Sequence, residues 1–199
     1  MFSVEGRHVI EENSAGTVNV LGISGSLREG SHNTALLRVA EKLLLPGRRV
    51  KIWDGLSAVA PFNEDHETHP GSAVFDMCSA VRDAGALLIA TPEYNTSIPG
   101  QLKNALDWLS RPPGRGPLSG KIAAVIGASQ SNYGAAWSQE AVKRVLQASG
   151  AVVVGEPLHL ARAHEAFTPE GRLRDDEYAR TLARVLTQLA EAALVDEPG

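Results

Sequence analysis

Short apolar runs alternate along the chain with longer stretches in which apolar residues recur at helical spacing. The short runs are typical of buried strands, and they cover residues 17–23, 49–53, 86–90, 121–127 and 151–154. The helical pattern, with apolar residues at i, i+3, i+4 and i+7, predicts helices over residues 35–45, 72–84, 99–109, 135–149 and 175–194. Because the strands are almost continuously apolar, we expect helices to cover both faces of the sheet that they form.

Strands that alternate with helices predict βαβ units and a parallel sheet. Since crossovers between parallel strands are right-handed, few topologies remain. We predict an α/β protein with the flavodoxin-like three-layer fold, in which a five-stranded parallel sheet has the order 2-1-3-4-5 and helices lie on both faces. Residues 17–196 would form this domain, and residues 1–16, which are polar and lack periodicity, would form an N-terminal extension.

Three polar loops follow the first, third and fourth predicted strands and cover residues 24–34, 91–99 and 128–134. In the order 2-1-3-4-5 these strands are neighbours, so their loops meet at the carboxyl edge of the sheet. Open α/β sheets bind ligands at this edge, beside the point where the strand order reverses. The three loops are therefore the candidate site.

The first loop precedes a predicted helix and is rich in hydrogen-bond donors. N–H groups at a helix N-terminus form a site for anions, and the side chains that add donors or positive charge are Ser26, Arg28, Ser31, Asn33 and Thr34. The loop has neither the G-x-G-x-x-G pattern of dinucleotide sites nor the P-loop pattern, so we predict a site for a terminal phosphate. The alternative is a capped helix start in which Ser31 is only the N-cap.

The second loop, residues 91–99, is bounded by prolines. Pro92 and Pro99 stiffen it, Tyr94 offers an apolar face, and Glu93 and Asn95 offer polar contacts. Such a loop suits the edge of a flat heteroaromatic ring. The alternative is an ordinary strand–helix connection, but such connections usually have about two to six residues. The third loop, residues 128–134, has small and aromatic residues and is a weak signal by itself.

The first two loops carry motifs that resemble the NAD(P)H-dependent FMN reductase family, which has the flavodoxin-like fold and includes quinone, chromate and azo-dye reductases. Residues 25–33 match the pattern G-S-L-R-x-x-S-x-N. Residues 91–108 match T-P-E-Y-N-x-S-x-P-G-x-L-K-N-A-x-D-W at every specified position, and this motif is long and specific. The similarity extends over nearly the whole chain except residues 1–16.

The resemblance implies a non-covalently bound FMN at the carboxyl edge of the sheet. The residues that would hold its phosphate are Ser26, Arg28, Ser31 and Asn33. The residues that would line its isoalloxazine ring are Pro92, Glu93, Tyr94 and Asn95, and Ser129 would contact the flavin from the third loop.

The resemblance also implies an activity. NADPH or NADH would pass hydride to the flavin, and a quinone, a free flavin or a similar small electron acceptor would then take the electrons. The family commonly forms dimers or tetramers, so we expect a homodimer or homotetramer. The alternative is a one-electron carrier of the flavodoxin type, or a flavin-binding protein without turnover.

The third loop departs from the family's pattern, S-x-G-x-x-G-G followed by x-R-A. Ser131 and Ala135 stand in place of two glycines, and Trp137 stands at the arginine position. Since a Cβ atom restricts backbone angles, these substitutions affect the shape of the substrate opening and the nicotinamide preference.

Composition excludes several other classes. The net charge is −4 and no long basic run occurs, which argues against a nucleic-acid partner. One cysteine excludes an internal disulfide and a cysteine-based zinc site within one chain. The His- and acid-rich residues 63–69 lie in a polar loop, where we expect solvated side chains and no metal. The N-terminus lacks the apolar segment of a signal peptide, and no apolar run is long enough to cross a membrane, so we expect a cytoplasmic protein.

Overall fold

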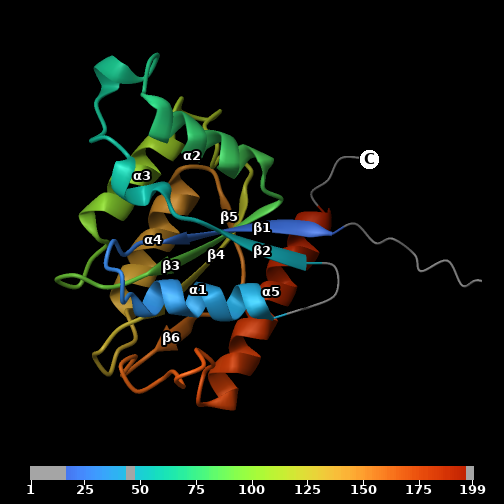
Figure 1. The fold of residues 1–199 in the computed structure, drawn as a ribbon. Coiled ribbons are helices and arrows are strands. Elements are labelled where there is room, and N and C mark those ends of the chain that lie inside the picture. The colour runs from blue at the N-terminus through green and yellow to red at the C-terminus, as the bar shows by residue number, and fades with distance from the viewer. Residues whose placement is uncertain (1–16, 44–47, 196–199) are drawn as a thin grey trace, which may run out of the picture.

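A parallel β-sheet lies at the centre of the molecule, with its strands in the order β2-β1-β3-β4-β5 (Figure 1). The structure is a computed structural model and describes residues 17–43 and 48–195. The strands are β1 (Val18–Ser24), β2 (Arg48–Trp53), β3 (Ala86–Thr91), β4 (Ile122–Ala128), β5 (Val152–Val153) and β6 (Leu158–Leu160). This order confirms the predicted flavodoxin-like α/β fold. The predicted extension, residues 1–16, lies outside the described residues.

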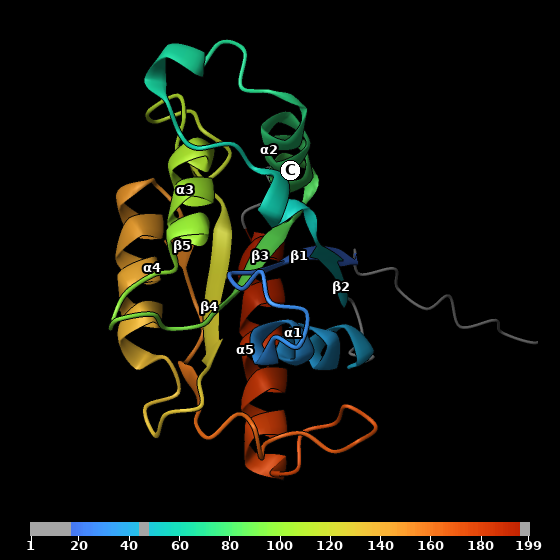
Figure 2. The ribbon, with the colours of Figure 1, turned by 60° about the vertical axis from the view of Figure 1, so that its left-hand side comes forward.

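Helices cover both faces of the sheet, as the apolar strands predict (Figure 2). The helices are α1 (His32–Lys42), α2 (Ser72–Asp83), α3 (Gly100–Leu109), α4 (Ala136–Ala148) and α5 (Asp176–Val195), with short 3₁₀ turns η1 (Gly55–Ala58) and η2 (Glu64–His66) in the loop before α2. Helices α1 and α5 pack on one face, and α2, α3 and α4 pack on the other. Successive residues of a strand point to opposite faces, so Leu88 of β3 lies in the first core and Leu87 in the second.

Four helix starts differ from the predicted ones, those of α4 and α5 by a single residue. Helix α1 begins at His32, three residues before the predicted start, because the Ser31 hydroxyl accepts a hydrogen bond from the Thr34 N–H and caps the helix. Helix α3 begins at Gly100, and Pro99 is its N-cap residue with an extended backbone rather than its first helical residue. Both differences are of the size usual for element boundaries predicted from sequence.

The prediction for the fifth strand was incomplete. Residues 151–154 were predicted as one strand and the residues after them as a polar loop. The chain instead pairs with β4 twice, first through β5 and then through β6, whose residues Leu158 and Leu160 align with Ile126 and Ala128. Between the two pairings, Gly155 has a φ of +87°, and Pro157 has no N–H to donate. The ladder is therefore interrupted and resumes at β6, beside the end of β4.

The register places the ends of three strands at one edge of the sheet. Ser24 of β1 pairs with Ala90 of β3, and Thr91 of β3 pairs with Gly127 of β4. The polar loops that follow these strands consequently start side by side, as expected from the strand order.

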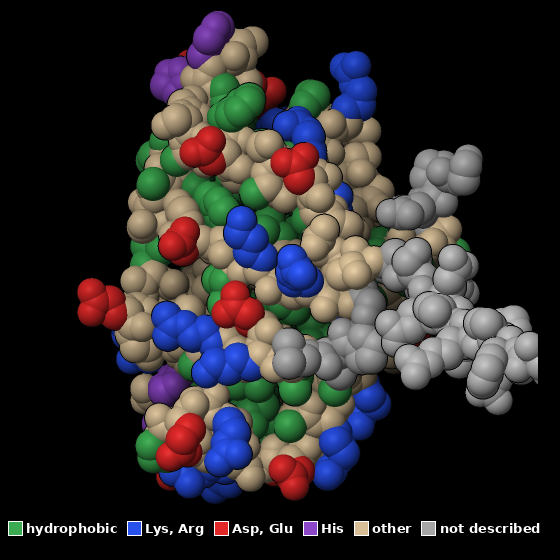
Figure 3. Space-filling view, turned by 45° about the vertical axis from the view of Figure 1, so that its right-hand side comes forward, with side chains coloured by type: hydrophobic (Ala, Val, Ile, Leu, Met, Phe, Trp, Pro, Cys, Tyr) green, Lys and Arg blue, Asp and Glu red, His purple; other side chains and the backbone are tan. Residues whose placement is uncertain are grey.

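One face of the molecule carries charged side chains of both signs. Lys and Arg side chains are interspersed with Asp and Glu side chains over this face, and hydrophobic side chains show between them (Figure 3). This face therefore presents no broad field of one sign. Among the helices of the described residues, none combines the length and apolar character that a membrane span needs.

Candidate functional site

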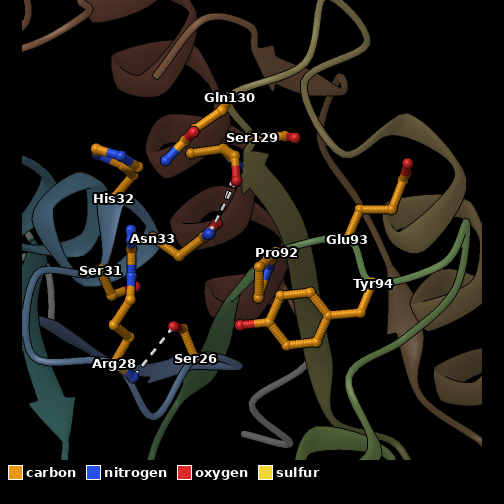
Figure 4. Close-up of a pocket in the computed structure, with 11 residues that line it drawn as sticks. Ser26, Arg28, Ser31, His32, Asn33, Pro92, Glu93, Tyr94, Ser129 and Gln130 are labelled. Atoms are coloured by element: carbon orange, nitrogen blue, oxygen red, sulfur yellow. Dashed lines mark hydrogen bonds between the residues drawn. The ribbon is translucent and has the colours of Figure 1, made fainter. Parts of the chain in front are cut away.

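A cleft of about 380 Å³ opens at the carboxyl edge of the sheet, where the three loops meet (Figure 4). The predicted site residues that line it are Ser26, Arg28, Ser31, Asn33, Pro92, Glu93, Tyr94 and Ser129. Its size lies within the range of small-molecule pockets, about 300–1,000 Å³. Residues more than a hundred positions apart in sequence, such as Ser26 and Ser129, thus share one cleft.

Two predicted site residues lie outside the residues that line the cleft. Thr34 donates its hydroxyl to Ser24 Oγ at 2.8 Å and its N–H to Ser31 Oγ at 3.2 Å. Its hydrogen bonds therefore stabilise the first loop. Asn95 is exposed at the tip of the second loop.

The first loop is folded tightly by its own hydroxyl groups. Ser24 Oγ accepts from the Ser26 N–H and Ser26 Oγ accepts from the Arg28 N–H, each at 3.4 Å. The Ser31 N–H donates to the Arg28 carbonyl at 3.1 Å. These contacts bring the loop directly onto the N-terminus of α1, where the first N–H groups of the helix lack intrahelical partners.

The geometry of this end of the cleft suits an anion. The N-terminus of α1 carries the positive end of the helix dipole, and Arg28 adds a guanidinium that also donates to the Gly30 carbonyl at 3.1 Å. The first loop also packs closely on Pro92 of the second loop and on Leu102 of α3. A Cβ added at Gly25 would lie 2.7 Å from a Leu102 methyl group and 3.2 Å from the Pro92 ring. The donors therefore lie close to Pro92, within reach of one ligand.

Asn33 has a role that its sequence position did not indicate. Its amide donates to the Ala128 carbonyl and accepts from the Ala128 N–H, both at 2.9 Å. The residue is only 2% exposed, so its side chain joins the start of α1 to the end of β4. The side-chain amide predicted to hold phosphate is thus engaged in fixing the first loop to the third.

The second loop forms a tight hairpin tip. Tyr94 and Ser97 exchange two backbone hydrogen bonds, at 3.2 and 3.1 Å, across Asn95 and Thr96, whose φ angles are +51° and +58°. Two successive left-handed residues are the signature of a type I′ turn. Pro92 and Pro99 at the base are buried. Tyr94 is 53% exposed, and its ring extends along the cleft with the hydroxyl toward Ser26 (Figure 4).

Glu93 points away from the middle of the cleft (Figure 4). Its carboxylate accepts from the backbone N–H groups of Trp137 and Ser138, at 3.0 and 3.1 Å. A carboxylate is favourable at a helix N-terminus, and Glu93 takes the place of a capping side chain that Ala135, the N-cap residue, cannot supply. Beside it, the hydroxyls of Thr91 and Ser138 lie 2.8 Å apart. The second loop is thereby fixed to α4.

The third loop is held to the segment that follows β6. The Ser129 N–H donates to the Leu160 carbonyl and the Ala163 N–H donates to the Ser129 carbonyl, both at 3.0 Å. Ser131, which replaces a family glycine, accepts from the Tyr133 N–H through its hydroxyl at 3.2 Å. Ala135, which replaces another, has a φ of +62°, a conformation unfavourable for a residue with a Cβ.

Three residues that line the cleft were not among the predicted site residues, namely His32, Ala128 and Gln130. Each is next to a predicted site residue in the sequence, so adjacency was the available signal. No motif specified these three side chains, and His32 stands at an unspecified position of the first motif.

The cleft thus joins an anion site at one end to a stiff loop with an aromatic side chain at the other. Such a site suits a ligand with a phosphate group and a flat ring system, held without a covalent bond. The side chains that bound it orient a ligand, and the redox chemistry would come from that ligand.

Comparison with known proteins gives concordant matches. A profile of the family described as NADPH-dependent FMN reductase matches residues 18–165. An NAD(P)H-dependent FMN reductase of Pseudomonas aeruginosa is 41% identical over 174 residues, which are 86% of this chain and 93% of that protein. A quinone reductase of Escherichia coli is 33% identical over 142 residues, 70% of this chain and 75% of that protein. In three dimensions, the flavoenzyme NAD(P)H:(acceptor) oxidoreductase FerB of Paracoccus denitrificans superposes with a TM-score of 0.77 at 32% identity, covering 90% of this chain and 96% of that one.

The Asn33 clamp is testable by stability. Asn33→Ala should lower the free energy of unfolding by about 2–4 kcal/mol, because it removes two buried hydrogen bonds and leaves the Ala128 peptide groups unpaired. The matched control is Asn132→Ala in the exposed part of the third loop, which should change it by about 0.5 kcal/mol or less. Urea denaturation measures both, and equal effects of the two substitutions would contradict the clamp.

Adjacent substitutions in the third loop should have opposite effects. Gly134→Ala would put a Cβ 2.3 Å from the His159 carbonyl carbon and should cost about 3 kcal/mol or more. Ala135→Gly relieves the left-handed strain of about 1–2 kcal/mol, partly offset by about 0.4–1 kcal/mol of added freedom in the unfolded chain. We therefore expect its stability to be unchanged or slightly higher. Thermal unfolding of both variants checks this, and a marked loss in Ala135→Gly would refute the strain.

Proposed function

Because the chain belongs to the NADPH-dependent FMN reductase family, we propose that it passes reducing equivalents from NAD(P)H through a bound FMN to a quinone, a free flavin or a similar small acceptor. The observation that carries the proposal is that the N-terminus of α1 and the stiff Tyr94 loop line one cleft. A one-electron carrier remains the alternative from another class.

The chain's residues fit FMN at both ends of the cleft. Ser26, Arg28 and Ser31 surround the anion site at the N-terminus of α1 and would hold the phosphate. Pro92, Tyr94 and Ser129 would contact the isoalloxazine ring. Asn33 and Glu93 would act indirectly, since their side chains fix the first and second loops to β4 and α4.

When bound, FMN would supply the hydride chemistry, accepting from NAD(P)H and reducing the acceptor. The chain would supply orientation and electrostatics. The helix dipole and Arg28 at the anion site would fix the position of the ligand along the cleft. Backbone N–H groups of the second and third loops would stabilise negative charge on the reduced ring, as preorganised donors do.

The rim beside the second loop is aromatic and favours a planar acceptor. The rings of Tyr133 and Trp137 lie 4.6 Å apart, and the two side chains are 60% and 46% exposed. The Trp137 N–H donates to Glu93, which places the start of α4 directly beside the second loop. Quinones are planar and apolar enough to stack on such side chains. Quinone reductases occur among the relatives.

We also propose a homodimer or homotetramer in which a second copy packs against the aromatic rim and completes the pocket for the acceptor. Three large side chains, Tyr94, Tyr133 and Trp137, are about half exposed there, and contact would remove their apolar surface from water. We propose a cytoplasmic location, because NAD(P)H is the electron donor and the sequence has one cysteine and no disulfide pair.

The reductase proposal is tested by the visible spectrum of the purified protein. We expect flavin absorbance that bleaches on anaerobic addition of NADPH or NADH and returns when a quinone is added, with repeated turnover. Riboflavin in place of FMN should restore less activity at equal concentration. A bound flavin that stays oxidised with both nucleotides but accepts single electrons from dithionite would establish the carrier instead.

The oligomer is tested by light scattering. We expect a mass of at least twice the 21.1 kDa chain at micromolar concentration, and Trp137→Glu should shift the mass toward the monomer because it places a charge in the contact. Val152→Glu, at an exposed position of the edge strand β5, is the matched control and should leave the mass unchanged. A monomeric wild-type protein would contradict the proposal.

A further inference from the structure

His32 is the side chain of the cleft whose role is not explained by the motifs. It is the first residue of α1 and lines the cleft beside Arg28 and Ser31. It lies at the anion end of the cleft, whereas Pro92 and Tyr94 lie across from it (Figure 4). An imidazole in this position lines the end of the cleft where the phosphate is proposed to bind.

The position of the imidazole is fixed by a residue from a distant segment. Its ring is parallel to the Phe167 ring, with 6.1 Å between centroids and an interplanar angle of 5°. The segment that carries Phe167 is tied to the third loop, since the Arg162 N–H donates to the Ser131 carbonyl at 3.1 Å. A backbone bridge between Phe167 and Leu173 closes this segment on itself. The imidazole is therefore supported by Phe167, which is not among the residues that line the cleft.

The ring nitrogens of His32 are available to a ligand. Within the described part of the chain, neither nitrogen has a hydrogen-bond partner, although the side chain is half-buried. A neutral imidazole carries one N–H donor, and a protonated one carries two. Charge-assisted hydrogen bonds to phosphate are stronger than neutral ones. A bound phosphate would therefore favour the protonated ring.

The charges around His32 oppose protonation while no anion is bound. Burial, the Arg28 guanidinium and His164 hold the pKa of His32 below its ordinary value. Arg28 comes from the loop before α1, and His164 from the segment after β6. The carboxylate of Glu165, in the same segment, lies 3.3 Å from His164 Nε2. These groups thus disfavour the protonated ring of His32 in the free protein.

We propose that His32 is a further phosphate-binding residue, and that its imidazole takes up a proton when the phosphate of FMN binds. The inference rests on the proposed FMN site and adds to it a group that makes binding depend on pH. A phosphate dianion beside the ring supplies the opposite charge that favours imidazolium. The site then gains the positive charge of His32, in addition to that of Arg28, only when the anion is present to neutralise it.

The sign of the pH dependence follows from linkage. Binding raises the pKa of His32 from its depressed value in the free protein, so the complex holds more protons than the free partners in the interval between the two values. The affinity for FMN should therefore fall as the pH rises through that interval. Riboflavin, which has no phosphate, should show no such dependence on His32.

The test compares FMN with riboflavin on the full-length chain after its flavin has been removed by exchange. At pH 7.5, His32→Gln should weaken FMN binding about tenfold, the size expected for one charge-assisted hydrogen bond, and leave riboflavin binding within about twofold. Arg28→Ala is the positive control and should also weaken FMN selectively. His66→Gln, an exposed histidine of η2, is the matched control and should change neither ligand.

Calorimetry in buffers of different ionisation enthalpy adds a readout of the proton. The wild-type protein should take up a fraction of a proton with FMN that His32→Gln lacks. If that variant does not fold, NMR of wild-type His32 with inorganic phosphate decides, and a rise in its pKa with phosphate supports the proposal. Equal losses for FMN and riboflavin, or an unchanged proton count, would overturn it. A wild-type protein that binds FMN no better than riboflavin would overturn the phosphate site itself and hence the proposed function.

Discussion

The pair of hydrogen bonds between the Asn33 amide and the Ala128 backbone holds the cleft together. It joins the start of α1 to the end of β4, 95 positions apart in sequence, in a place from which water is excluded. Unpaired peptide groups there would be costly, so the first and third loops are fixed relative to each other. The second loop is attached in the same way, by the Glu93 carboxylate on the N–H groups of α4. The ligand site is thus built from loops that are linked before any ligand arrives.

The long motif over residues 91–108 serves two different structural purposes. Its first half makes the proline-bounded hairpin tip at the cleft. Its second half holds the loop before α2: the Gln101 amide donates to the Leu56 and Val59 carbonyls, at 2.9 and 2.8 Å, and the Trp108 indole donates to the Ala60 carbonyl at 2.8 Å. Asn104 of the same helix donates to Ala60 and accepts from the Phe62 N–H. A motif that is typical of FMN-binding proteins therefore contains residues whose polar groups bind the backbone of the loop before α2 and do not line the cleft.

The departures in the third loop are accommodated by local chemistry. The Ser131 hydroxyl accepts hydrogen bonds from the Ser129 hydroxyl and the Tyr133 N–H within the turn, while Ala135 adopts left-handed angles and offers no capping side chain. The carboxylate of Glu93 caps α4 from outside the helix, and the backbone of Gly134 packs against His159 of β6 too closely for any side chain. Strand β6 and the segment after it thus pack against the third loop, and this segment carries Phe167 to His32.

The sequence was sufficient to predict the layers, the strand order and the three loops, because strand and helix periodicity and the turn residues are local properties. It also determined most residues that line the cleft, since two motifs name them directly. The tertiary structure alone decided what those residues contact. The partners of Asn33, Glu93 and His32 lie 44 or more positions away, and no local pattern encodes such a distance. Strand β6 was hidden for a related reason: three residues in a polar segment become a strand only because the edge of β4 is there to pair with them.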